Sequence, residues 1–135
     1  MNVIAVENVL WVKKEKGIAA SGRIPEEAEF FQDHFPGFPV LPGVLALEML
    51  KQSADCYLRA VTEDPSASFS FKKISAVKFS DYLKPGDKWE SELSFLSGTD
   101  EEYRWNARLS SNGKTAVTAR LALKPQISPK AAVVF

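Results

Sequence analysis

The 135-residue sequence is poor in the side chains that bind metals and form disulfides. It contains one cysteine, Cys56, and one histidine, His34. A single cysteine cannot close a disulfide within the chain, and such low cysteine use is typical of a reducing, cytoplasmic setting. Zinc sites need three or four nitrogen, sulfur or carboxylate ligands held together, so this composition argues against a zinc centre. We therefore expect no metal site.

The sequence also lacks an excess of charge and a long apolar run. Seventeen basic and seventeen acidic side chains give a formal net charge of zero, whereas nucleic-acid binding needs clustered excess Lys and Arg. No apolar stretch approaches the roughly 18 residues of a membrane span, and no signal-peptide pattern is evident. These absences argue against nucleic-acid and membrane partners and favour a soluble cytoplasmic protein.

The composition that remains is that of a globular domain. Hydrophobic residues make up 45% and charged residues 25% of the chain, which are ordinary values for a folded protein. A chain of this length suits one domain with one core. We therefore expect residues 1–135 to form a single domain, with the proline-containing segment 124–135 as a C-terminal tail.

A single long helix is predicted from Gly43 to about Pro65, because proline cannot continue a helix. Apolar side chains recur there at helical spacing, namely Leu47, Leu50, Ala54, Leu58 and Val61. Strands are predicted before and after it, at residues 3–12, 18–24, 69–79, 89–95, 103–109 and 117–123. Asn112-Gly113 predicts a tight hairpin turn. The order is a hairpin, one helix and then an antiparallel meander, which favours an α+β fold with a curved sheet wrapped around the helix. One face of that sheet would need polar cover or a partner subunit.

A proline-rich loop leads into the predicted helix. Pro42 suits the first helical turn, where its missing N–H is not needed. Gly43 follows with no side chain, so its N–H is accessible at the positive end of the helix dipole. Glu48 lies on one helix stripe with Val44 and Gln52. The helix start is therefore a candidate site.

Three groups in this region have the chemistry that an elimination needs. The neutral imidazole of His34 suits a general base near neutral pH. The N–H of Gly43 at the helix start can hold the charge that develops on a carbonyl oxygen. Glu48 lies in an apolar run, and a carboxyl group in apolar surroundings can remain a proton donor at neutral pH. Together they could remove a proton beside a carbonyl and expel a β-hydroxyl as water.

Each of these groups also has a plainer interpretation. A lone histidine is more often structural or solvent-exposed, and a glutamate in a helix is usually solvated. The prolines and glycines could simply form a tight turn. The residues alone therefore permit an elimination site without requiring one.

The loop and helix start form one long motif. It reads His34-Phe35-Pro36-Gly37-Phe38-Pro39-Val40-Leu41-Pro42-Gly43-Val44-Leu45, followed by Glu48 and Gln52. This motif closely resembles the signature of the β-hydroxyacyl-(acyl carrier protein) dehydratases, which have the hotdog fold. The step of fourteen residues from His34 to Glu48 matches, and so do both Pro-Gly pairs. The region Val77 to Asp87 is also similar, and the resemblance covers Ile18 to Leu123.

The resemblance implies a lyase that dehydrates (3R)-hydroxyacyl thioesters to trans-2-enoyl thioesters, in fatty acid synthesis or a related lipid or polyketide pathway. It implies that His34 is the catalytic base, that Glu48 is the acid that handles the β-hydroxyl, and that the Gly43 N–H holds the thioester carbonyl. Gln52 would orient Glu48 or its water, with Val44 in support.

The resemblance also implies an assembly and a partner. In this family the site lies between two subunits, so a homodimer is expected, and higher oligomers stay open. The phosphopantetheine arm of an acyl carrier protein delivers the substrate, and no metal or dissociable cofactor is expected. The acyl chain would run in a tunnel along the helix, lined by Phe79 and Tyr82. An acidic carrier would fit a basic rim, for which the candidates are Lys72, Lys73, Lys78, Lys84 and Lys88.

Two other functions stay open from the sequence. One is a hotdog acyl-thioesterase, in which a helix carboxylate activates water and free thiol is released. The other is a non-catalytic acyl-binding subunit of a synthase assembly, suggested by Lys51, which stands where the family commonly has a small residue. The retention of His34, Gly43 and Glu48 favours dehydration over both.

Overall fold

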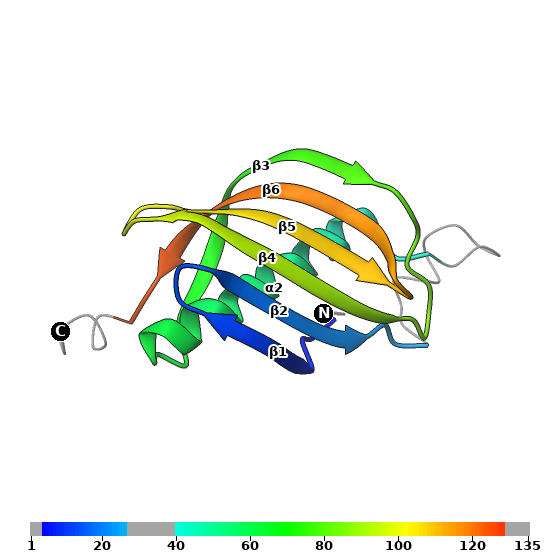
Figure 1. Ribbon diagram of the computed structural model, residues 1–135, viewed down its shortest axis with the longest axis horizontal. Helices are drawn as coiled ribbons and strands as arrows, with labels where there is room; N and C mark the ends of the chain where they lie inside the picture. The colour runs from blue at the N-terminus through cyan, green and yellow to red at the C-terminus, as the bar shows by residue number, and fades with distance from the viewer. Residues whose placement is uncertain (1–3, 27–39, 129–135) are drawn as a thin grey trace.

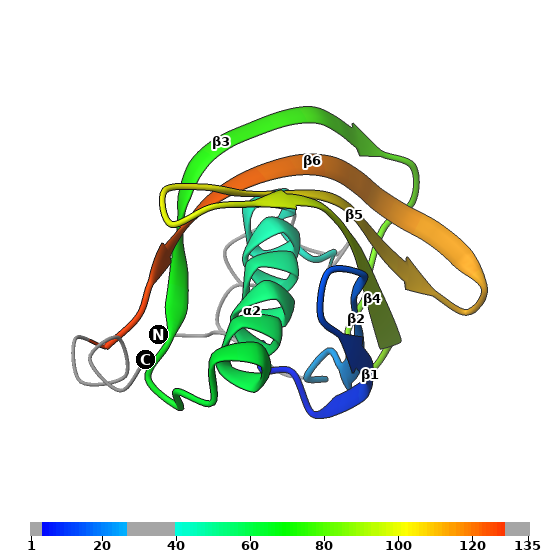
Figure 2. The same cartoon turned by 60° about the vertical axis from the view of Figure 1, so that its left-hand side comes forward.

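The computed structural model describes residues 4–26 and 40–128, in which an antiparallel sheet curves around one helix (Figure 1). The sheet has six strands, β1 (Asn8–Lys13), β2 (Gly17–Arg23), β3 (Ser68–Phe79), β4 (Lys88–Gly98), β5 (Tyr103–Ser111) and β6 (Lys114–Gln126), and the helix is α2 (Gly43–Thr62). Figure 2 shows α2 lying in the hollow of the curved sheet. This confirms the predicted α+β fold with the sheet wrapped around one central helix. No helix in this part of the chain is long and apolar enough to cross a membrane.

Helix α2 buries one side against the sheet. Of the predicted apolar stripe, Leu50, Ala54 and Leu58 are fully buried, and each buried leucine contributes about 1.5–3 kcal/mol of transfer free energy. The helix ends where Glu63 adopts a left-handed backbone conformation with φ 55°, two positions before Pro65. The helical spacing and the proline therefore predicted this element correctly.

The strand order is β1-β2-β4-β5-β6-β3, with every pairing antiparallel. The sequence led us to expect a meander after the helix, and β4, β5 and β6 do form one. For β3 this expectation is wrong. β3 pairs with β6 at the far edge of the sheet, while β2 occupies the free side of β4. Because β3 pairs with β6, its last residue, Phe79, lies beside Val117 of β6 and near the start of α2.

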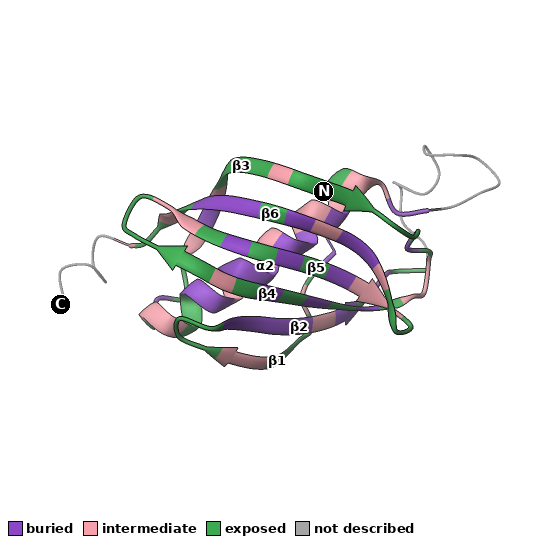
Figure 3. Cartoon of the chain, turned by 45° about the horizontal axis from the view of Figure 1, so that its top comes forward, coloured by how far each residue is buried: buried purple, intermediate pink, exposed green. Residues whose placement is uncertain are grey.

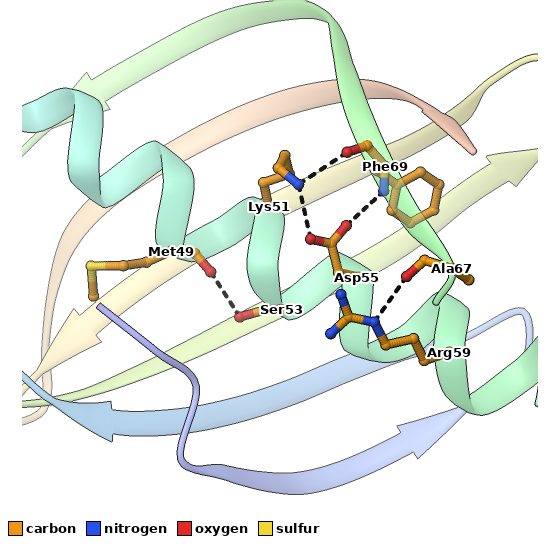
Figure 4. Close-up of polar contacts among 7 residues, drawn as sticks. All are labelled: Met49, Lys51, Ser53, Asp55, Arg59, Ala67 and Phe69. Atoms are coloured by element: carbon orange, nitrogen blue, oxygen red, sulfur yellow. Dashed lines mark hydrogen bonds and ion pairs between the residues drawn. The ribbon is translucent and has the colours of Figure 1, made fainter. Parts of the chain in front are cut away.

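A cluster of polar side chains around the buried Asp55 fastens the beginning of β3 to α2 (Figure 4). The ammonium group of Lys51 lies 2.8 Å from Asp55 Oδ2 and donates to the carbonyl oxygen of Phe69 at 3.0 Å. The backbone N–H of Phe69 donates to Asp55 Oδ1 at 2.7 Å. One turn further on, Arg59 Nε donates to the carbonyl oxygen of Ala67 at 2.8 Å. These bonds satisfy backbone groups of Ala67 and Phe69 at the start of β3, and they fix this edge of the sheet relative to the helix.

The outer face of the sheet is polar. Exposed and buried residues alternate along β4 and β5, as Figure 3 shows. Arg108 donates to Glu92 at 3.0 Å, and Arg120 donates to Asn106 at 3.3 Å, across neighbouring strands of that face. Polar cover, one of the two possibilities left by the sequence, is therefore present on this face.

The strand β6 begins after a tight turn and extends into the segment expected as a C-terminal tail. Asn112 and Gly113 have φ values of 53° and 76°, so the residues predicted as a tight turn connect β5 to β6 with left-handed backbone at both positions. At its other end β6 continues to Gln126, three residues into the segment expected as a tail. Pro125 lies beyond Leu123, the last residue of β6 that pairs with β5, so its missing N–H breaks no hydrogen bond to that strand.

Candidate active site

An apolar cavity of about 290 Å³ lies at the start of α2. It is lined by Val40, Leu41, Gly43, Ala46, Phe79, Asp81, Tyr82, Leu83 and Val117. Three residues singled out in the sequence, Gly43, Phe79 and Tyr82, meet here from the helix, from the end of β3 and from the loop that follows it. A mainly apolar cavity of this size with few polar groups is the usual form of a small-ligand site.

Gly43 forms the floor of this cavity beneath the ring of Phe79. A Cβ atom added at residue 43 would lie 2.8 Å from Cζ and 3.0 Å from Cε1 of that ring, so the ring or the helix start would have to move to admit a side chain. The residue before it, Pro42, caps the helix with φ −58° and ψ 138° and offers no side-chain hydrogen bond. The helix therefore starts with backbone N–H groups that no capping side chain satisfies, which is the feature that makes helix N-termini attractive to oxyanions.

Glu48 and Gln52 lie on a different side of α2 from Gly43. At 100° per residue, the five positions from Gly43 to Glu48 leave these residues about 140° apart around the helix axis. Glu48 is half-buried, and Val44, one turn before it on the same stripe, is 72% exposed. Neither lines the cavity at Gly43. One chain therefore presents its uncapped helix start and its candidate acid in two different directions.

Gln52 contributes to a second, separate cavity of about 300 Å³. Its other lining residues are Ala5, Val6, Asp55, Cys56 and Arg59. Burial raises the pKa of the Cys56 thiol, the nearby Arg59 guanidinium opposes this increase, and Asp55 adds to it. The thiol thus stays protonated at neutral pH, as expected for a packing residue.

His34 lies outside the described residues, so its role stays a prediction. On either side of residues 27–39 the described chain is held by hydrogen bonds to the segment 83–87. The N–H of Leu41 donates to the carbonyl oxygen of Leu83 at 2.7 Å, and the N–H of Ile24 donates to the carbonyl oxygen of Asp87 at 2.7 Å. The turn predicted at residues 84–87 therefore holds Ile24, and Leu83 directly before it holds Leu41.

Of the five lysines expected to form a basic rim, Lys78 and Lys84 lie next in sequence to residues that line the cavity. All five lysines are exposed. Lys78 and Lys84 are sequence neighbours of the lining residues Phe79 and Leu83, whereas Lys72 pairs with Glu102 at 3.3 Å.

Several lining residues were not identified from the sequence. Leu41, Leu83 and Val117 come from three separate segments, and only the folded chain brings them together. Val117 belongs to the alternating apolar pattern of the last strand, which marked it as inward-facing but not as a cavity wall.

The backbone conformation of Ala76 in β3, with φ 52°, had no sequence signal, because alanine is not the residue expected in left-handed backbone.

Comparison with known proteins gives one consistent family. Residues 11–120 match the family model described as ApeI-like, ApeI dehydratase. Among curated proteins, the 3-hydroxyacyl-(acyl-carrier-protein) dehydratase FabZ of Burkholderia cenocepacia is 32% identical over 122 residues, covering 88% of this chain and 79% of its own. The enzyme of the same name from Bacillus pumilus is 30% identical over 127 residues, covering 94% and 87%.

Solved structures agree on the fold. The dehydratase heterocomplex ApeI:P of Xenorhabdus doucetiae superposes with a TM-score of 0.72 at 18% identity, covering 97% of this chain and 88% of that one. A mutant of the Pseudomonas aeruginosa thioesterase PA1618 superposes with a TM-score of 0.62 at 15% identity, covering 93% and 82%. The hotdog fold is therefore shared with thioesterases as well, whereas the sequence matches are to dehydratases. The chain belongs to the ApeI-like family of hotdog dehydratases.

Proposed function

We propose that this protein dehydrates (3R)-hydroxyacyl thioesters, carried on the phosphopantetheine arm of an acyl carrier protein, to trans-2-enoyl thioesters. The observation that carries the proposal is the apolar cavity at the uncapped start of α2, with Gly43 as its floor, in a chain whose curated relatives are named 3-hydroxyacyl-(acyl-carrier-protein) dehydratases. The reaction needs no electron transfer, so the chain's own residues suffice.

In the proposed mechanism His34 removes the proton from C2 of the substrate as general base. The Gly43 N–H, at the positive end of the α2 dipole, stabilises the negative charge that develops on the thioester oxygen. Glu48 donates a proton to the β-hydroxyl, the C3–O bond breaks, and water leaves. Gln52 orients Glu48 or the departing water, and Val44 supports the backbone next to Gly43. The enoyl double bond forms between C2 and C3.

The working unit of this mechanism is a homodimer. Its support is that the cavity at Gly43 is lined by neither Glu48 nor Gln52 of the same chain, and that Glu48 lies about 140° from Gly43 around the α2 axis. β3 offers the means of association, because it is an edge strand that carries exposed apolar side chains, namely Phe71, Ile74, Val77 and Phe79. Edge strands of this kind pair readily with a second copy. Each site would then take His34 from one subunit and Glu48 from the other.

The carrier protein delivers the substrate as a thioester on its phosphopantetheine arm, and the proposed reaction uses no cofactor. Lys78 and Lys84, beside the cavity, are the members of the basic rim best placed to meet an acidic carrier. Exposed charges of this kind act mainly on the association rate, so charge reversal at these lysines raises KM more than it lowers kcat.

The test is complementation between two inactive variants. His34→Ala and Glu48→Gln should each lose dehydration of 3-hydroxybutyryl-carrier protein and hydration of the crotonyl thioester. After the two are mixed and allowed to exchange subunits, half of the dimers are mixed and each holds one intact site, so about a quarter of wild-type activity returns. Variants that keep wild-type rates refute the roles of these residues. Inactive variants that never complement refute the shared site. Release of free thiol instead of enoyl thioester identifies a thioesterase, and acyl-carrier binding without turnover identifies a non-catalytic subunit.

A further inference from the structure

The ladder between β3 and β6 contains a bulge just before the residue that covers Gly43. Two residues of β3, Ala76 and Val77, occupy the place opposite the single residue Ala119 of β6. Ala76 has φ 52°, which is left-handed backbone. In the bulge type whose first residue is left-handed, that residue is normally glycine. A non-glycine residue held in this conformation is uncommon, and such positions cluster where a site needs a particular geometry.

The bulge decides which side chain of β3 faces the cavity. Ile74 lies opposite Leu121 and Phe79 lies opposite Val117, so five steps along β3 are matched to four along β6. In a regular ladder, four steps from Ile74 would bring Lys78 opposite Val117 instead. Directly opposed residues in an antiparallel pair point to the same face, and a slip of one residue exchanges the two faces.

The face that the bulge selects is the one that lines the cavity. Val117 is buried and forms part of the cavity wall, and the ring of Phe79 beside it lies over Gly43. In the slipped register the ammonium group of Lys78 would occupy that place and Phe79 would turn to the outer face. A charged group is costly in apolar surroundings, and an apolar acyl chain gains nothing from it.

We propose that the bulge at Ala76 and Val77 is a positioning device that presents Phe79 rather than Lys78 to the cavity, and so makes the site select long acyl chains over short ones. The selection of acyl chains rests on the proposed function, whereas the register itself does not. Ala76 acts through Phe79 and touches no substrate.

The experiment compares dehydration of 3-hydroxybutyryl- and 3-hydroxyoctanoyl-carrier protein by the assembled protein. Ala76→Val places a β-branched side chain where left-handed backbone is required. It should lower the kcat/KM ratio of the octanoyl to the butyryl substrate about tenfold or more, the scale of discrimination that apolar pocket contacts provide. Ala76→Gly, which fits left-handed backbone, should keep the wild-type ratio. Ser75→Val is the matched control, because it adds the same branching one position earlier at a residue without positive φ.

A rescue separates a register change from general damage. If the slip brings residue 78 opposite Val117, Lys78→Phe added to Ala76→Val restores a phenyl ring above Gly43 and returns the ratio to within about threefold of wild type. Lys78→Phe alone points outward; loss of this rim charge should raise KM for both carrier-bound substrates alike, so the ratio of their kcat/KM values should stay unchanged. A ratio that Ala76→Val leaves intact, or that the added phenylalanine fails to restore, overturns the proposal.

Two further measurements keep the proposal testable if Ala76→Val does not fold or the enzyme has another activity. Deleting Ala76 removes the bulge but leaves Phe79 opposite Val117, so the wild-type ratio should persist, and loss of selection in this variant refutes the register argument. Independently of turnover, nuclear Overhauser contacts from the Phe79 ring to Gly43 and Val117 should be present in the wild type. In the valine variant they should be replaced by contacts from residue 78. Persistence of the Phe79 contacts in the valine variant refutes the register change even where dehydration is absent.

Discussion

Substituting Asp55 tests how strongly the polar cluster of Figure 4 holds β3 to α2. Asp55→Asn keeps the size of the side chain, so no cavity forms. It removes the charge that faces the Lys51 ammonium at 2.8 Å and can turn an amide donor toward another donor. The side chains of Lys51 and Asp55 are only 15% and 7% exposed, so water cannot fully replace the lost partner.

The expected cost follows from these contacts. Removing one partner of a buried ion pair costs about 3–5 kcal/mol, and we expect about 3 kcal/mol here because the ammonium group keeps some access to water. The N–H of Phe69 retains an acceptor in the amide oxygen, so its hydrogen bond adds little to the loss. With an m value of about 2 kcal/mol/M, the urea midpoint should fall by about 1.5 M.

The assay is equilibrium urea unfolding followed by far-UV circular dichroism at one fixed protein concentration, because any assembly makes stability depend on concentration. Glu92→Gln is the control. It breaks the pair with Arg108 at 3.0 Å, whose side chains are 47% and 52% exposed, and should cost less than about 1 kcal/mol. The double variant Lys51→Met with Asp55→Asn removes the uncompensated ammonium and should be no less stable than Asp55→Asn alone. Equal costs for Asp55→Asn and Glu92→Gln would refute this account of the cluster.

Two further predictions concern the helix start and the acid stability. Gly43→Ala should lower kcat at least tenfold. Its Cβ would lie 2.8 Å from the Phe79 ring, and a movement of the helix start that relieves this contact displaces the backbone N–H that serves as oxyanion donor. An unchanged kcat in steady-state kinetics of the purified variant would contradict this. The pKa of Asp64 is lowered, first by the N–H of Ser128 and then by the hydroxyl and N–H of Ser66. A lowered folded-state pKa gives stability that is present above the unfolded value of 3.8 and is lost as the pH falls through the folded value. Melting temperatures measured from about pH 7 down to about pH 2 should therefore fall less steeply at the acid end for Asp64→Asn, and parallel profiles would contradict the assignment.

The elements that the sequence predicted well are those whose signals are local. The apolar spacing from Leu47 to Val61 and the proline after it are properties of one segment, and they defined α2 correctly. Asn112-Gly113 supplied the left-handed residues that its turn requires. The family resemblance singled out Gly43, Phe79 and Tyr82, which line one cavity in the structure, whereas the roles of these residues and of His34 stay predictions.

The elements that the sequence did not predict depend on partners far along the chain. Nothing in the pattern of residues 69–79 shows that this strand pairs with β6 rather than β4, since alternation marks a face and not a neighbour. Simple alternation from Phe69 would also place Lys73 and Ser75 inward. The structure instead places Ile74 opposite the buried Leu121, because bulges on either side of it change the register.

The two directions presented by α2 explain why one helix could serve two sites. In a symmetric pair each copy of α2 would give its N-terminal N–H groups to one cavity and its Glu48 carboxyl to the other. The cluster around Asp55 then has a role beyond stability, since it joins the helix that carries Glu48 to the edge strand proposed to meet the second copy. A displacement of β3 relative to α2 would move the carboxyl of one subunit relative to the Gly43 N–H of the other. Elimination requires both groups within hydrogen-bond distance of one substrate, so the geometry of this one strand would couple assembly to catalysis.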